Sequence, residues 1–194
     1  MINLYKAISL AAALCFSSSI QASSLGFGSI TQTGQQLNVE LAISGLGDGM
    51  ADSLSTYDLD ILFDSSHLAY VSSSFGDSEL GNQLDLFGFG DNFAFSGTVV
   101  TGVLNVYEES FDLAEDLNNL QASSFNLATI AFDILKSDIS QLQLLVNALG
   151  DANGNSLSAT LNTATVTTVP VPAAFWLMAS GLVALYRKKH CDFR

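Results

Sequence analysis

Residues 57–76 read YDLDILFDSSHLAYVSSSFG, and this stretch decides the fold class that the sequence predicts. Apolar side chains at Tyr57, Leu59, Ile61 and Phe63 alternate with Asp58, Asp60, Leu62 and Asp64. A period of two residues is typical of a half-buried β-strand, because successive side chains point to opposite faces of a sheet. Asp64-Ser65-Ser66 then predicts a turn, and residues 67–75 predict a second strand.

Similar patterns continue through the middle of the chain. Leu37, Val39, Leu41 and Ile43 alternate with polar or small residues. Further strands are predicted over residues 93–106 (one or two strands), 125–135, 142–149 and 157–169. Seven to nine strands at this spacing, with no proline between residues 23 and 168, predict an all-β, jelly-roll-like antiparallel β-sandwich.

One segment of the middle predicts a helix instead. Residues 108–120 read EESFDLAEDLNNL, in which Phe111, Leu113 and Leu117 are apolar. We expect a short helix or an ordered loop here, packed across one end of the sandwich.

The composition excludes two classes of protein. Of the 194 residues 48% are apolar and 13% charged, which excludes a disordered chain. The formal net charge of −13 excludes nucleic acid as a partner, because it repels phosphate backbones. Between residues 23 and 186, Lys136 is the one cation against 18 acidic residues, a net charge of −17 for that stretch. The other cations lie near the chain ends, which is typical of segments read by membrane machinery.

Residues 1–22 predict a secretory signal peptide. Lys6 supplies its positive charge, residues 7–16 form an apolar core too short to span a bilayer, and Ile20-Gln21-Ala22 ends in a small residue suited to cleavage. A buried N-terminal helix and a lipoprotein signal at Cys15 are the alternatives. Removal of Cys15 leaves the following domain without a cysteine, which excludes a disulfide framework and a zinc–thiolate site there.

Residues 169–186 read VPVPAAFWLMASGLVALY and carry no charge. As a helix they would be about 27 Å long, just enough to span a bilayer, and we place the transmembrane helix itself at residues 173–186. Their basic neighbours favour a cytoplasmic C-terminus with the domain held outside; these are Arg187, Lys188 and Lys189. A buried C-terminal strand or helix is the alternative.

The order of a proline motif, an apolar helix and a basic cluster resembles the PEP-CTERM sorting signal. The usual core of that signal is Val-Pro-Glu-Pro, whereas this chain has Val169, Pro170, Val171 and Pro172, with Val171 replacing the glutamate. The resemblance implies that residues 169–194 are recognised by exosortase, a membrane-embedded cysteine peptidase expected to act as a transpeptidase. It also implies a link to exopolysaccharide production and biofilm.

Two stretches of the middle resemble the cohesin-like domains found in many PEP-CTERM proteins. In residues 57–76 a strand of alternating apolar and acidic residues ends in Phe63-Asp64, and a second strand ends near Gly76. Residues 124–135, SFNLATIAFDIL, are similar to a later strand of that domain. The resemblance implies a nine-stranded, cohesin-like jelly roll over residues 23–168. It also implies a binding role, since cohesins bind partner modules and related sandwiches bind polysaccharide.

The middle of the chain offers little for catalysis. It has one histidine, His67, for which a surface position is the simpler interpretation, and it has no G-x-S-x-G motif. Gly26-x-Gly28 and Gly88-x-Gly90 lack the strand-to-helix context of a phosphate site. We therefore expect that the protein is not an enzyme. The rival hypothesis is an enzyme that acts on surface polysaccharide through a carboxylate pair that the sequence does not identify.

Calcium is the one metal that the acidic residues suggest. Asp151, Asn153 and Asn155 place oxygen ligands at positions 1, 3 and 5 of a calcium-loop pattern. The pattern then fails, because Ser156 replaces the glycine of position 6 and Asn162 the acid of position 12. A polar hairpin turn is the alternative. A solvated loop is likewise the alternative for a second acidic region, formed by Asp77, Glu79, Asp85 and Asp91.

Together these patterns predict an exported, non-enzymatic protein with a binding or structural role at the cell surface or in the extracellular matrix. Its precursor is held briefly in the inner membrane, processed by an exosortase-type enzyme, and then released or attached. The expected partners are exopolysaccharide or another surface protein, and no cofactor is expected apart from calcium. A permanently membrane-anchored adhesin is the alternative to release.

Overall fold

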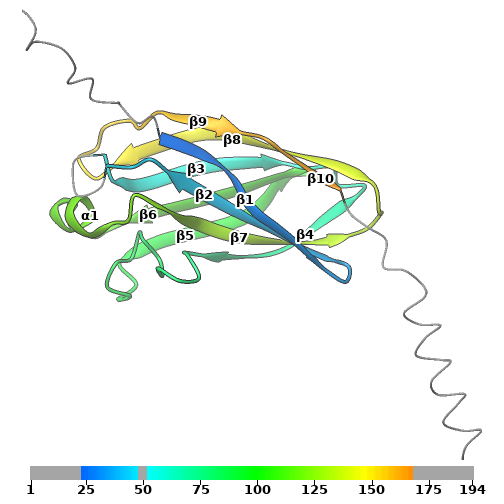
Figure 1. Ribbon diagram of the computed structural model, residues 1–194, viewed down its shortest axis with the longest axis horizontal. Coiled ribbons are helices and arrows are strands. Elements are labelled where there is room, and N and C mark those ends of the chain that lie inside the picture. Colours follow the sequence, from blue (N-terminus) through cyan, green and yellow to red (C-terminus); the bar gives the residue numbers. More distant parts are fainter. Residues whose placement is uncertain (1–22, 48–51, 168–194) are drawn as a thin grey trace, which may run out of the picture.

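The computed structural model describes residues 23–47 and 52–167, which form two five-stranded β-sheets packed face to face (Figure 1). One sheet, which we call the β2 sheet, has the strand order β4 (Leu68–Phe75), β7 (Ser124–Ile134), β2 (Gln36–Ser44), β1 (Ser23–Thr33) and β9 (Ala159–Asn162). The other, the β3 sheet, has the order β10 (Ala164–Thr167), β8 (Ile139–Asp151), β3 (Leu54–Leu62), β6 (Val103–Ser110) and β5 (Asn92–Val100).

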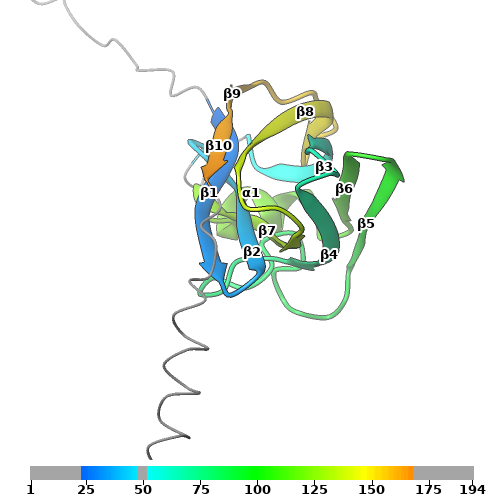
Figure 2. The same ribbon diagram turned by 90° about the vertical axis from the view of Figure 1, so that its right-hand side faces the viewer.

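The strand pairs of both sheets are antiparallel, except that β1 and β9 run parallel to each other. Viewed along the strands, the two sheets form separate layers (Figure 2). The predicted jelly-roll-like antiparallel sandwich is therefore confirmed. The ten described strands exceed the number expected, because β1 was not predicted and residues 157–169 supply two short strands instead of one.

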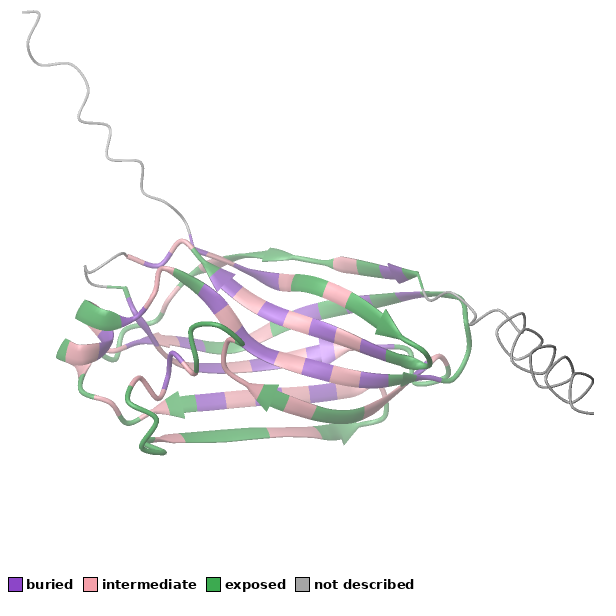
Figure 3. Cartoon of the chain, turned by 60° about the horizontal axis from the view of Figure 1, so that its bottom comes forward, coloured by how far each residue is buried: buried purple, intermediate pink, exposed green. Residues whose placement is uncertain are grey.

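The core lies between the sheets and consists of the alternating residues that the sequence indicates. Buried and less buried positions follow one another along the strands (Figure 3). On β3, Tyr57, Leu59 and Ile61 are fully buried. Phe63 follows β3, and its ring centroid lies 5.2 Å from that of Phe132 on β7. From β2, four side chains at most 2% exposed complete this layer, namely Leu37, Val39, Leu41 and Ile43.

The helix predicted over residues 108–120 is wrong in its first half. Only α1 (Ala114–Leu120) is helical, while Glu108 belongs to β6 and has none of its surface exposed. The period of two set by Leu104 and Val106 continues to Glu108, so that its side chain also points into the sandwich. Of the apolar residues that suggested a helical face, Leu117 alone is buried.

The signal peptide predicted at residues 1–22 and the sorting signal at 169–194, with its transmembrane helix at 173–186, lie outside the described residues. Within residues 23–47 and 52–167, no helix is both long and apolar enough to cross a membrane.

The two ends of the sandwich differ in what they carry (Figure 1). At one end lie α1 and the loop of residues 76–91, which joins β4 to β5. At the opposite end lie the β5–β6 turn, the β7–β8 turn and Thr167, the last residue of β10.

Candidate functional site: the outer face of the β3 sheet

The outer faces of the two sheets have different chemistry. Outward positions of the β2 sheet hold mostly small or polar side chains, among them Asn38, Ala42, Thr129 and Ala131. The exposed large apolar residues on its strands are Val71 and Leu161, at the two edges of the sheet. Outward positions of the β3 sheet hold large aromatic, aliphatic and acidic side chains instead. We call the second surface the aromatic–acidic face; it consists of Asp58, Asp60, Phe93, Phe95, Asn105, Tyr107, Glu109, Leu145 and Asn147.

Strand pairing places the aromatic residues of this face side by side. Phe93 and Phe95 of the edge strand β5 pair with Glu109 and Tyr107 of β6. The ring centroids of Phe93 and Tyr107 lie 6.0 Å apart. Phe93 is 55% exposed, Phe95 47% and Leu145 of β8 48%, so this face presents a substantial apolar area to solvent. Exposed apolar area rimmed by polar groups is typical of a protein interaction site.

Hydrogen bonds fix the carboxylates of the face in place. The Asn105 side-chain amide donates to Asp58 Oδ1 at 2.6 Å and to Asp60 Oδ1 at 2.9 Å. Tyr107 Oη donates to Glu109 Oε2 at 2.7 Å, and this bond to the carboxylate raises the pKa of Tyr107. Residues 23–167 contain one lysine and no arginine with which to balance the charge of these carboxylates.

Asp58 and Asp60 form a carboxylate pair, but not one placed as a glycosidase requires. They lie two residues apart on the outer face of one strand and share one amide donor, whereas the two carboxyl groups of a glycosidase flank its substrate. A hollow of about 310 Å³ lies elsewhere, at the β5–β6 end of the sandwich, and Asp64 is its one carboxylate. Hydrogen bonds from Ser66 and His67 lower the pKa of Asp64 to about 2, which suits an acceptor and not a general acid.

His67 lies in the turn before β4, one residue ahead of that strand, which was predicted to begin at residue 67, and its side chain is 21% exposed. Its Nδ1 lies 2.8 Å from Asp64 Oδ2 and 3.0 Å from Ser66 Oγ. A catalytic triad needs the acid and the nucleophile on different ring nitrogens, so that the base can pass a proton. The three residues therefore stabilise a turn and do not form a triad.

The structure places the calcium candidates in the hairpin turn that follows β8. Asp151 Oδ1 accepts hydrogen bonds from the backbone N–H groups of Asn153 and Asn155, at 2.9 and 2.6 Å. Asp151 Oδ2 accepts one from the side-chain amide of Asn155 at 3.0 Å. Burial raises the pKa of Asp151, and these hydrogen bonds outweigh it, so that the pKa lies below its ordinary value. The carboxylate thus closes a polar turn, and calcium at Asp151, Asn153 and Asn155 stays a prediction.

The second acidic region is not gathered into one site. Asp77 Oδ1 accepts from the backbone of Glu79 and Leu80, and Asp85 accepts from that of Phe89 and Gly90. These carboxylates therefore shape the loop of residues 76–91. Across the part of the chain that the structure describes, no group of three or more acidic, histidine or cysteine side chains is placed to hold a metal ion.

A buried polar cluster beneath this loop was missed by the sequence reasoning. Glu108 Oε1 accepts from the side-chain amides of Asn82 at 2.6 Å and Asn92 at 2.7 Å, and Oε2 accepts from Tyr57 Oη at 2.9 Å. Burial raises the pKa of Glu108, although the three hydrogen bonds oppose the rise. The alternation of Leu104, Val106 and Glu108 was the signal that would have indicated a buried carboxylate.

The comparisons with known proteins identify the fold. No family model and no curated protein matches the sequence. Solved cohesins match the structure: CaCohA2 from Clostridium acetobutylicum has 17% identity and a TM-score of 0.58, covering 77% of this chain and 92% of its own. A non-cellulosomal cohesin from Archaeoglobus fulgidus has 16% identity and a TM-score of 0.56, and the match covers 79% of this chain and 96% of that cohesin.

A third match was solved with a bound protein. It is the sixth cohesin of scaffoldin B from Acetivibrio cellulolyticus, in complex with a mutant Cel5 dockerin, with 17% identity, a TM-score of 0.57, and coverage of 76% of this chain and 99% of its own. Identities this low establish shared architecture alone. The described residues therefore have the cohesin fold.

Proposed function

We propose that this chain is an exported, non-enzymatic binding module that recognises a protein partner through its aromatic–acidic face. The observation that carries the proposal is the contrast between the two outer faces of the sandwich. The β2 sheet presents mostly small or polar side chains with the acids Glu40 and Asp133, whereas the β3 sheet presents Phe93, Phe95 and Tyr107 beside three carboxylates. A face built only for solubility gains nothing from exposed phenylalanines.

The partner's surface follows from the chemistry of this face. Aromatic side chains supply most of the binding energy when a partner desolvates them, so Phe93 and Phe95 are the expected anchors. Asp58, Asp60 and Glu109 are acceptors, and they select a partner that carries lysine, arginine or other donors. The cohesin fold supports this assignment, because a solved cohesin of the same fold is bound to a dockerin module.

We propose further that the predicted export and sorting signals bring this module outside the cell. Residues 1–22 direct export, and residues 169–194 are recognised by an exosortase-type enzyme while the precursor is held in the inner membrane. Processing then leaves the module on the cell surface or in the extracellular matrix, where it contributes to biofilm and to contacts with exopolysaccharide. The support for this part is the sequence layout of Val169-Pro170-Val171-Pro172 followed by the apolar and basic segments.

A binding comparison with matched variants tests the role of the face. The mature protein is used to capture extracellular proteins from its own source, and the captured partner is then titrated by calorimetry. Asp58→Asn with Asp60→Asn should raise Kd by at least about tenfold, or about 1.4 kcal/mol. The control removes two acids from the outer face of the β2 sheet, Glu40→Asn and Asp133→Asn, and should leave Kd within about twofold.

Two outcomes would contradict the proposal. Equal weakening by both pairs of substitutions would mean that only the net charge of the protein matters. Hydrolysis of polysaccharide by the purified protein, lost in the Asp58→Asn, Asp60→Asn variant, would identify an enzyme instead.

A further inference from the structure

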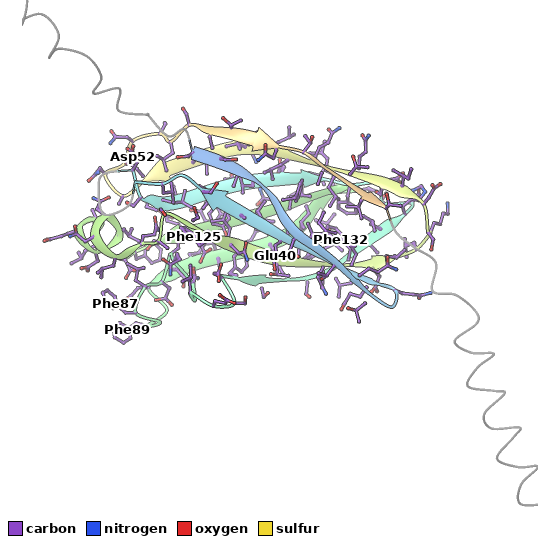
Figure 4. All side chains as sticks on the ribbon, in the orientation of Figure 1. Glu40, Asp52, Phe87, Phe89, Phe125 and Phe132 are labelled. Carbon is purple, nitrogen blue, oxygen red and sulfur yellow. The ribbon has the colours of Figure 1, made fainter. Side chains whose placement is uncertain are left out.

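A second apolar surface lies at the end of the sandwich that carries α1. Phe87 and Phe89 stand on the loop of residues 76–91, 48% and 78% exposed, and point away from core residues such as Phe125 and Phe132 (Figure 4). Their ring planes are inclined by 23°, with centroids 6.0 Å apart. We call this surface the aromatic tip; it consists of Phe87, Phe89 and, on the segment between β6 and α1, Phe111 and Leu113, which are 62% and 72% exposed.

Local hydrogen bonds hold the tip in one shape. Asp85 accepts from the backbone N–H groups of Phe89 and Gly90, both at 3.0 Å. The backbone N–H of Leu86 donates to Asp112 Oδ2 at 2.9 Å, which joins the loop to the segment that carries Phe111. The exposed rings are therefore mounted on a loop whose turns are already closed by hydrogen bonds.

Deeper contacts tie the same loop to the core. Asn82 donates to the buried Glu108 carboxylate. Gln83 is 8% exposed; its Oε1 accepts from the Ala122 backbone, and its carbonyl accepts from the Gln121 side chain, each at 2.9 Å. A loop anchored in this way binds a partner at a lower entropic cost than a loop that must first be ordered.

The charges around the tip are all negative. The loop, the segment between β6 and α1, and α1 itself carry acidic residues and no lysine or arginine; the acids are Asp77, Glu79, Asp85, Asp91, Asp112, Glu115 and Asp116. Lys136, the one lysine among the described residues, lies at the opposite end, where its backbone N–H donates to the His67 carbonyl. Anionic lipids, anionic polysaccharides and a second copy of this acidic chain would therefore be repelled from the tip.

We propose that the aromatic tip is a second docking surface, and that its occupant is a peptide segment in which lysine or arginine flanks large apolar side chains. The apolar side chains pack on Phe87 and Phe89, and the cations match the surrounding carboxylates. The tip lies at the opposite end of the sandwich from Thr167, where the described chain ends (Figure 1). With the aromatic–acidic face, it allows the module to hold two partners at once.

Synthetic peptides test the occupant against the full chain. One peptide combines lysine with leucine and phenylalanine, a second replaces each lysine by glutamate, and a third keeps the lysines but replaces the apolar residues by serine. We expect the first to bind at least about tenfold more tightly than the other two. Raising the ionic strength from about 0.01 M to about 0.15 M should weaken it, because the Debye length falls from about 30 to about 8 Å.

Paired substitutions locate the binding. Phe87→Ser with Phe89→Ser should weaken the lysine-containing apolar peptide at least about tenfold, whereas Phe93→Ser with Phe95→Ser should change its Kd by less than about twofold. Both pairs are exposed, so thermal melts are expected to confirm that each variant folds. Binding lost in the Phe93, Phe95 variant instead would place this peptide on the aromatic–acidic face and overturn the second surface. Tip-dependent binding to phosphatidylcholine vesicles, or to the glutamate peptide equally well, would also overturn it.

Discussion

Glu108 is a buried carboxylate whose environment disfavours its charged form. Its folded pKa lies above the unfolded value of about 4.3, because burial disfavours the carboxylate. Relative to the unfolded chain, folding therefore shifts the proton equilibrium of Glu108 toward its protonated form. The stabilisation is fully present below about pH 4.3 and is lost as the pH rises through the folded pKa.

We predict that Glu108→Gln removes this dependence. The free energy of unfolding of the wild type, relative to that of the variant, should fall as the pH rises from about 4 toward neutrality. Urea unfolding at a series of pH values measures it. Asp64→Asn is the control of opposite sign: the pKa of Asp64 is lowered to about 2, so its contribution is present above about pH 3.9 and disappears as the pH falls. Parallel curves for wild type and Glu108→Gln would contradict the assignment.

At the scale of an element, the loop of residues 76–91 contains four glycines with left-handed backbone, and two of them, Gly76 and Gly81, differ in their surroundings. Gly76 has φ +90°, and a Cβ there would lie 2.9 Å from the Asn82 Cα. Gly81 has φ +75°, and a Cβ there would meet nothing within 4 Å. Glycine is therefore required at position 76 both for the left-handed backbone and for the close contact with Asn82, and at position 81 for the left-handed backbone alone.

Alanine at these two positions should separate the two effects. Each substitution should cost about 1–2 kcal/mol for the left-handed conformation, and Gly76→Ala should cost clearly more, because the backbone of Asn82 must also move. Chemical denaturation of both variants measures the difference. Equal costs would show that the loop yields freely at Asn82, contrary to the anchoring described for it.

Some elements were predictable from sequence because a single physical signal dominates them. From Leu37 to Ile43 on β2 and from Tyr57 to Ile61 on β3, buried apolar residues alternate without a break with less buried ones. β1 escaped prediction because glycine occupies positions 26 and 28 and its register shifts between Phe27 and Ile30. The helix boundary was misplaced because a glutamate is expected at the surface. The sequence does not reveal the three hydrogen-bond donors that allow Glu108 to be buried in a strand.

The candidate site was predictable only in part. The alternation of apolar and polar residues on β3 predicts that Asp58 and Asp60 point outward from the same strand. Their neighbours on the face come from β5, β6 and β8, and no local pattern states which strands will lie side by side. Phe87 and Phe89 lie in a loop, where apolar periodicity carries no information about exposure. Sheet order and loop anchoring are tertiary properties, and they arise from contacts far apart in sequence.

At the scale of the whole molecule, the prediction concerns processing at both ends. The mature protein should be shortened near Ala22 and near Pro172, and Pro170→Ala with Pro172→Ala should leave the precursor in the inner membrane. Intact mass of the protein from its native source, with cell fractionation of the variant, measures both results. Mature wild-type material that still contained residues 187–194 would refute the sorting signal.

The parallel pairing of β1 with β9 joins segments that are far apart in the sequence. Ser24 and Asn162 are 138 residues apart in sequence, and yet their side chains share a hydrogen bond of 3.0 Å. Contacts between such distant segments make folding slow, roughly milliseconds to seconds for all-β domains. In a chain that emerges N-terminus first, β1 can pair with β9 only after residues 159–162 have emerged. A precursor exported as we propose therefore begins its transit without this strand pair in place.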